Sequence, residues 1–193
     1  MAYLWAPPQY RWTDLLNSDY HDHRGSGQRV DRLEVDDWLA TFLELCGYRR
    51  GRLPGKSGRA ELRQVRSDLA RLVSQVVSGP GPTARDLEIL NRYLRRAATQ
   101  PRVDPVRGNV QLREIPSTKG LDRVIGHVAR TLAETLAKGE PERIKVCANP
   151  DCHWVMVDES RNRTRRWCEP GACGNLLKVR QFRARRGHGA KTP

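Results

Sequence analysis

Apolar residues recur at helical spacing in four stretches of the chain. In each stretch they fall three or four residues apart, which places them on one face of an α-helix. Glycines and prolines end three of these stretches. They lie at Gly47, in the segment 78–82 and in Gly139-Glu140-Pro141. The pattern predicts helices on these apolar positions: Val35, Trp38, Leu39, Phe42, Leu43 and Cys46; Leu62, Val65, Leu69, Leu72, Val73 and Val76; Leu87, Leu90, Leu94 and Ala97; and Leu121, Val124, Ile125, Val128, Leu132 and Leu136.

Local signals refine two of the boundaries. Thr83, followed three residues later by Asp86, predicts a capping-box start for the third helix. Between the third and fourth helices, apolar residues at 103–106 and 110–112 flank Gly108-Asn109, which indicates a small β-hairpin.

The chain divides by its composition into two parts. Residues 1–30 are polar and carry glycine and proline, with one apolar patch around Trp12, Leu15 and Leu16. We expect an α+β fold in which residues 1–140 form a mainly helical domain with a small β element. Residues 141–193 should form a separate metal module.

Four cysteines in the second part have the spacing of one metal site. Cys147 and Cys152 are separated by four residues, as are Cys168 and Cys173, and each pair encloses turn-forming residues. Two such pairs suit a closed tetrahedral Zn²⁺ site, which is structural because four thiolates leave no open position for water. An iron–sulfur cluster would also take four cysteines, but pairs linked by a hairpin favour zinc.

Local propensities give the metal module a predicted order of elements. The segment 153–157 should form one strand, 158–162 a turn and 163–167 the returning strand. A turn at Pro170-Gly171 should then lead into a helix from about 174 to 186. This order is that of a treble-clef zinc finger, with Trp154 and Trp167 packing its small core.

Basic residues gather next to the predicted metal site. The net charge is +13, and residues 161–193 carry ten Lys and Arg against one acid, Glu169. Such an excess favours a polyanionic partner. We expect nucleic-acid contacts from a hairpin and helix set: Arg161, Arg163, Arg165, Arg166, Lys178, Arg180, Arg183, Arg185 and Arg186.

A family resemblance rests on the same residues. Residues 143–186 resemble the CGNR-type zinc finger, which is found at the C-terminus of bacterial proteins regarded as transcription regulators. The family pattern is matched by Cys147 to Cys152, by Asp158 with Ser160, Arg161 and Asn162, by Arg165 to Cys168, and by Cys173 to Asn175. Leu176 stands where the family has its final Arg. The earlier part resembles the ABATE domain through Leu16-Asn17-Ser18, Val35, Trp38, Leu39 and Gly47.

The resemblance implies a bacterial transcription regulator. Its N-terminal domain would sense a small-molecule effector or form a homodimer, and its finger, with one structural Zn²⁺, would bind DNA. Charge alone does not distinguish DNA from RNA, and a zinc module that binds RNA or another protein is the alternative.

The histidines indicate an enzyme as a further, less favoured alternative. His21, Asp22 and His23 lie close in sequence, and His153 follows a zinc ligand, so a metal-dependent nuclease or hydrolase is conceivable. The last helix has no histidine to complete such a site. We therefore expect no catalytic residues, a core position for His127, and an inert core thiol at Cys46.

The absence of a membrane-spanning segment and of a signal-peptide pattern favours a cytoplasmic location. No segment approaches the apolar length of a membrane span, and the N-terminus lacks the pattern of a signal peptide. The odd number of cysteines also disfavours a disulfide framework. We expect a cytoplasmic protein without membrane contact.

Overall fold

The computed structural model describes residues 5–48 and 52–188. Its main helices are α2 (Asp36–Leu45), α3 (Lys56–Ser78), α4 (Ala84–Leu94) and α5 (Gly120–Ala137). They confirm the four helices predicted from apolar spacing. The predicted capping box is also present: Thr83 Oγ1 accepts from the Asp86 amide, and the Asp86 carboxylate accepts from the Thr83 amide at 3.0 Å.

A short helix precedes these four and was predicted only as an apolar patch. A 3₁₀ turn (Pro8–Tyr10) leads into α1 (Arg11–Leu16), where Trp12 and Leu15 are fully buried. Strands β1 (Asp19–His21) and β2 (Arg29–Asp31) then form an antiparallel ribbon, followed by a 3₁₀ turn, Arg32–Glu34. Six helical residues become stable here because the core buries them, not through their own propensity.

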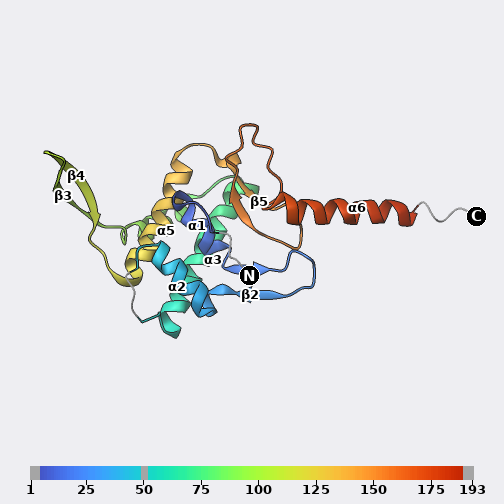
Figure 1. The fold of residues 1–193 in the computed structure, drawn as a ribbon, viewed down its shortest axis with the longest axis horizontal. Helices are drawn as coiled ribbons and strands as arrows, with labels where there is room; N and C mark the ends of the chain where they lie inside the picture. Colours follow the sequence, from blue (N-terminus) through green and yellow to red (C-terminus); the bar gives the residue numbers. More distant parts are fainter. Residues whose placement is uncertain (1–4, 49–51, 189–193) are drawn as a thin grey trace, which may run out of the picture.

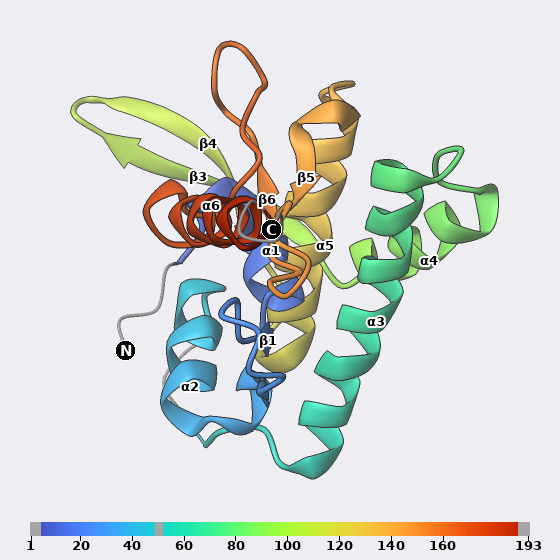
Figure 2. The same ribbon diagram turned by 90° about the vertical axis from the view of Figure 1, so that its right-hand side faces the viewer.

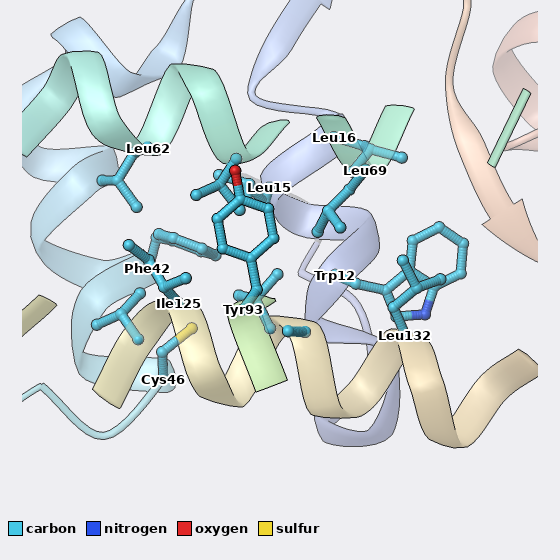
Figure 3. Close-up of a cluster of buried hydrophobic side chains, with 14 of the residues drawn as sticks. Trp12, Leu15, Leu16, Phe42, Cys46, Leu62, Leu69, Tyr93, Ile125 and Leu132 are labelled. Carbon is cyan, nitrogen blue, oxygen red and sulfur yellow. The ribbon is translucent and has the colours of Figure 1, made fainter. Parts of the chain in front are cut away.

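The core forms around α5. Side chains from α1, α2, α3 and α4 pack with it in one hydrophobic cluster, and Figure 3 shows Phe42, Tyr93, Leu69 and Trp12 spaced along its length. The indole Nε1 of Trp12 donates to Thr135 Oγ1 at 3.0 Å, so its one polar atom is satisfied inside the core.

Two sequence predictions about single residues concern this core. Cys46 is buried as predicted, and burial raises the pKa of its thiol, so it stays neutral and unreactive. His127 was expected in the core but is only half-buried on α5.

The predicted hairpin is confirmed and is longer than the pattern indicated. β3 (Thr99–Val106) pairs with β4 (Asn109–Pro116), with Val103 opposite Leu112. Arg107 and Gly108 at the tip both have positive φ, the conformation that two-residue hairpin turns require. The hairpin projects from one end of the molecule (Figure 1).

The C-terminal module confirms the α+β class but corrects the strand prediction. β5 (Ile144–Val146) pairs antiparallel with β6 (Val155–Val157). The partner of the strand predicted at 153–157 therefore lies before the first cysteine pair, not after it. The strand predicted at 163–167 is wrong, because that segment is irregular. A π turn (Pro170–Gly174) leads into α6 (Asn175–His188), which confirms the predicted last helix.

The module packs directly on the helical core. Ile144 of β5 is 3% exposed within the main hydrophobic cluster, and Val155 and Val157 of β6 pack against that cluster. The helix α6 extends away at the end opposite the β3–β4 hairpin (Figure 1), and Figure 2 shows it end-on.

Candidate metal centre and basic surface

The four cysteines predicted as ligands converge. One sulfur from each of Cys147, Cys152, Cys168 and Cys173 lies within 4.8 Å of the others. The Cys152–Cys168 and Cys168–Cys173 Sγ–Sγ distances are both 3.6 Å. A tetrahedral zinc ion with Zn–S bonds near 2.3 Å separates its sulfurs by about 3.8 Å, so the donor set fits Zn²⁺.

Two tight turns place these sulfurs. In the first, Asn149 Oδ1 accepts from the Asp151 amide at 3.2 Å and the Asn149 carbonyl accepts from the Cys152 amide at 3.0 Å. In the second, the π turn sets Cys173 just before α6. Because β5 and β6 fix the first turn and α6 follows the second, the ion would join the sheet to the helix.

The surroundings of the thiols favour a bound cation. A hydrogen bond with Cys168 chiefly lowers the pKa of Cys152 to about 5, while the same contact raises that of Cys168. Burial chiefly raises the pKa of Cys173 to about 12. The raised pKa values of Cys168 and Cys173 mean that further thiolates beside Cys152 are disfavoured unless a positive ion offsets their charge.

Hydrogen bonds and aromatic rings enclose the site. The Cys168 amide donates to Cys147 Sγ and Asn149 Nδ2 donates to Cys173 Sγ, both at 3.5 Å. Trp154 and Trp167 pack against the cysteine cluster, which confirms their predicted role in a small core. A closed shell of four sulfurs leaves no position for a substrate.

Asp158 organises the loop between the two cysteine pairs. Its side chain is fully buried and accepts from Lys145 Nζ at 2.6 Å, from Ser160 Oγ at 2.6 Å, and from the amides of Ser160 and Arg165, each at 2.9 Å. One carboxylate thus fixes both ends of the segment 158–165, which explains why an Asp precedes the Ser-Arg-Asn run.

Some of the basic residues predicted to bind nucleic acid have structural partners. Arg163 pairs with Glu140 and Glu142. Arg165 donates to the carbonyls of Trp167 and Cys168, and Arg180 binds Asp151 at 2.6 Å.

The other basic residues of the predicted set face outward. They are exposed and have no carboxylate within ion-pair distance among residues 5–48 and 52–188; these are Arg161, Arg166, Lys178, Arg183, Arg185 and Arg186. Arg166 stacks over Trp167 and Arg186 over Phe182. Arg161 and Arg166 lie on the irregular segment after β6, not on a strand.

Among the residues whose side chains the structure describes, the histidines do not assemble a second metal centre. The rings of His21 and His153 lie 4.7 Å apart, and His153 is exposed. Within the described part of the chain, the four cysteines form the one group of three or more candidate ligands.

Sequence reasoning missed the side chains that join the finger to the helical core. Asn17 Nδ2 donates to the Val155 carbonyl and Asn17 Oδ1 accepts from the Val155 amide, both at 2.8 Å. Asn149 Nδ2 also donates to the His23 carbonyl at 2.8 Å. Their only signal was a place in quoted motifs, Leu16-Asn17-Ser18 and the first cysteine loop.

Comparison with known proteins agrees with this geometry. Residues 143–186 match the CGNR zinc finger family, and residues 11–139 match the ABATE family, described as "Putative stress-induced transcription regulator". No curated protein matches the chain. In the described residues, no helix is both long and apolar enough to cross a membrane.

Proposed function

The chain belongs to the ABATE family of transcription regulators and ends in a CGNR zinc finger, and we propose from this that it binds duplex DNA through the finger. The site for one structural Zn²⁺ is the four-cysteine cluster. When bound, the ion would hold the two turns together as a closed scaffold. The finger's own residues would then make the contacts to DNA.

One observation carries the proposal. α6 projects from the body (Figure 1), and four of its cations, Lys178, Arg183, Arg185 and Arg186, have no carboxylate within ion-pair distance among the described residues. Lys178 and Arg185 lie seven residues apart, about two helical turns, so they share a face. Arg183 and Arg186 are exposed on the same helix. Cationic side chains that do not have to break an ion pair first are suited to phosphate contacts.

The base of α6 is fixed, which would give these cations a defined position. Cys173 precedes the helix and Arg180 binds Asp151 of the first cysteine loop. We therefore assign structural roles to Arg163, Arg165 and Arg180. The proposed contact set narrows to the residues that face outward: Arg161, Arg166, Lys178, Arg183, Arg185 and Arg186.

We propose that the two parts of the chain have the separate roles expected from the sequence. Residues 1–140 would sense an effector or dimerise, and residues 141–193 would contact DNA without catalysis. A two-fold dimer would suit a palindromic site. A protein acting on chromosomal DNA in this way would work in the bacterial cytoplasm.

Salt-dependent binding tests the proposal. The zinc-loaded chain should bind duplex DNA in fluorescence anisotropy, with an affinity that falls steeply as salt rises. Changing both Lys178→Gln and Arg185→Gln should reduce the slope of log K against log salt by about 2, since each lost phosphate contact removes roughly 0.9.

A matched double variant controls for net charge. Arg85→Gln with Arg92→Gln removes the same charge from exposed positions on α4, and it should change the slope little. Equal losses in the two double variants, or binding that ignores salt, would refute the proposed surface. Tighter binding to single-stranded RNA than to duplex DNA would favour the RNA-binding alternative.

A further inference from the structure

The loop between β1 and β2 belongs to the helical part of the chain but lies against the finger. It spans residues 22–28, and Figure 1 shows it reaching from the ribbon to the start of α6. Two hydrogen bonds from the finger hold it there. Arg180 of α6 donates to the Arg24 carbonyl at 2.5 Å, and Asn149 Nδ2 donates to the His23 carbonyl at 2.8 Å.

Arg180 joins three parts of the molecule at this point. Its Nη1 donates to Asp151 Oδ2 of the first cysteine loop at 2.6 Å, while its Nη2 donates to the Arg24 carbonyl. One guanidinium thus fixes the β1–β2 loop, the first cysteine loop and α6 relative to one another. A surface assembled from elements joined in this way needs little reordering to bind a partner.

Gly25 allows the loop to lie this close to the finger. Its φ is +83°, in the left-handed region, and a Cβ there would lie 2.9 Å from Arg180 Nη2 and 2.9 Å from Asp151 Oδ2. Both atoms belong to the ion pair just described, so a methyl group would have to separate the pair or lift the loop. Gly27 also has a positive φ, but nothing lies within 4 Å of a Cβ added to it. The docked loop therefore needs Gly25 for space and Gly27 only for its backbone conformation.

The docked loop places Arg24 beside α6. Arg24 is exposed, and among residues 5–48 and 52–188 no carboxylate lies within ion-pair distance of its guanidinium. The one acid in the loop, Asp22, is engaged within it: the side chain is 16% exposed and accepts from the Arg24 amide at 3.2 Å. Arg183 lies one turn beyond Arg180 on the same side of α6. It is exposed too, and has no carboxylate partner within the described part of the chain.

From this arrangement we propose that the β1–β2 loop is a second DNA-contact element, which binds the phosphate backbone beside α6. Arg24 from the loop and Arg183 from the helix would contact phosphates of the same stretch of duplex. Gly25, Ser26 and Gly27 follow Arg24 and have small side chains, so a DNA backbone can approach the loop closely. The proposal rests on the proposed function, since it concerns the same DNA, and it adds a residue of the helical part to the contacts assigned to the finger.

Fluorescence anisotropy with duplex DNA at several salt concentrations tests the contact in the zinc-loaded full chain. Arg24→Gln should reduce the slope of log K against log salt by about 0.9, the amount for one lost phosphate contact. Arg29→Gln is the matched control: it removes the same charge from the adjoining strand, where Arg29 already pairs with Asp19, and it should leave the slope unchanged. Equal changes in the two variants, or no change with Arg24→Gln, overturn the proposal.

Two glycine variants test whether docking against the finger positions Arg24. Gly25→Ala should weaken binding at about 0.1 M salt as much as Arg24→Gln does, roughly eightfold, because the loop can no longer lie against Arg180. Gly27→Ala strains the backbone in the same way but meets no other atom, so it should weaken binding much less. Zinc content should stay at one ion per chain in both variants, which excludes loss of the finger as the cause. Equal weakening by the two variants overturns the positioning role of the docked loop.

The double variant of Lys178→Gln with Arg185→Gln separates this proposal from the previous one. If the double variant reduces the salt slope and Arg24→Gln does not, the loop proposal fails and the proposed function stands. If only Arg24→Gln reduces the slope, the loop contact stands and the proposed surface on α6 fails. A zinc-loaded chain without affinity for duplex DNA would refute both.

Discussion

Asp158 shows how one residue can determine the shape of a loop. Burial alone would raise the pKa of this carboxyl, but hydrogen bonds from Lys145 and Ser160 outweigh burial and hold its pKa well below the usual range. The carboxylate is therefore charged at all ordinary pH values. Its ion pair with Lys145 is shielded from water, unlike the exposed pairs on the helices.

Replacing this carboxylate should destabilise the finger. Asp158→Asn removes a buried charge while Lys145 stays, so we expect a loss of about 3–5 kcal/mol in thermal or urea unfolding, with weaker zinc retention. Glu88→Gln breaks an exposed pair with Arg95 and should cost about 1 kcal/mol or less. Similar losses for the two variants would show that the Asp158 bonds contribute no more than a surface pair.

His127 predicts how stability responds to pH. Partial burial chiefly lowers the pKa of this imidazole, and the charge of Arg11 lowers it further. The folded state thus binds a proton less readily than the unfolded state, whose histidine titrates near pH 6.5. Stability should be complete above that pH and fall as the pH drops through it toward the folded pKa.

The variant His127→Gln removes this titration. Unfolding free energies measured from pH 7.5 to pH 5 should fall less steeply in the variant than in the parent chain. Parallel curves for the two proteins would mean that protonation of His127 is not linked to folding.

Among the elements, those with long periodic patterns were predictable. The helices α2 to α5 each carry an apolar stripe, and such a stripe specifies a helix wherever it occurs. The helix α1 could not be predicted as a helix, because its six residues are too few to show the helical spacing of apolar positions. The returning strand of the finger was placed at 163–167, where propensity favours it, but β6 pairs with β5 instead. Propensity does not identify a strand's partner, which packing decides.

Gly126 allows two of these elements to approach closely. A Cβ at this position on α5 would lie 2.5 Å from the Ala97 amide nitrogen and 2.5 Å from the Arg96 carbonyl carbon, just after α4. Gly126→Ala should therefore force the helices apart and cost about 1–3 kcal/mol, measured by urea unfolding. The gain in helix propensity, about 1 kcal/mol, is included in that range.

Gly55 provides the matched control. It has a negative φ, and nothing lies within 4 Å of a Cβ added there. Gly55→Ala should change the free energy of unfolding by less than about 1 kcal/mol, because the less favourable N-cap that Ala makes for α3 is offset by the lower entropy of the unfolded chain. If Gly126→Ala were equally neutral, the close crossing of α4 and α5 would be wrong.

At the scale of the whole molecule, the finger is built into the helical part more than its sequence suggests. The four-cysteine site could be predicted because spacing alone brings two pairs together. The docking could not, because it depends on single polar side chains such as Asn17 and Asn149 and on burial of Ile144. Yet the cysteine cluster and the main core are separate hydrophobic clusters. They should therefore respond differently when zinc is lost.

Zinc removal by Cys168→Ser tests this separation. Without the ion, the turns at 147–152 and 168–173 lose their common anchor, and α6, largely exposed, has too little packing to stay helical alone. Circular dichroism should show the loss of about one short helix, while α1 to α5 still unfold cooperatively at a lower temperature. Cys46→Ala, which changes a buried thiol outside the cluster, should keep one zinc per chain and full helicity. Collapse of all helical signal in Cys168→Ser would mean instead that the helical core cannot fold without the ion, and that the two clusters form one cooperative unit.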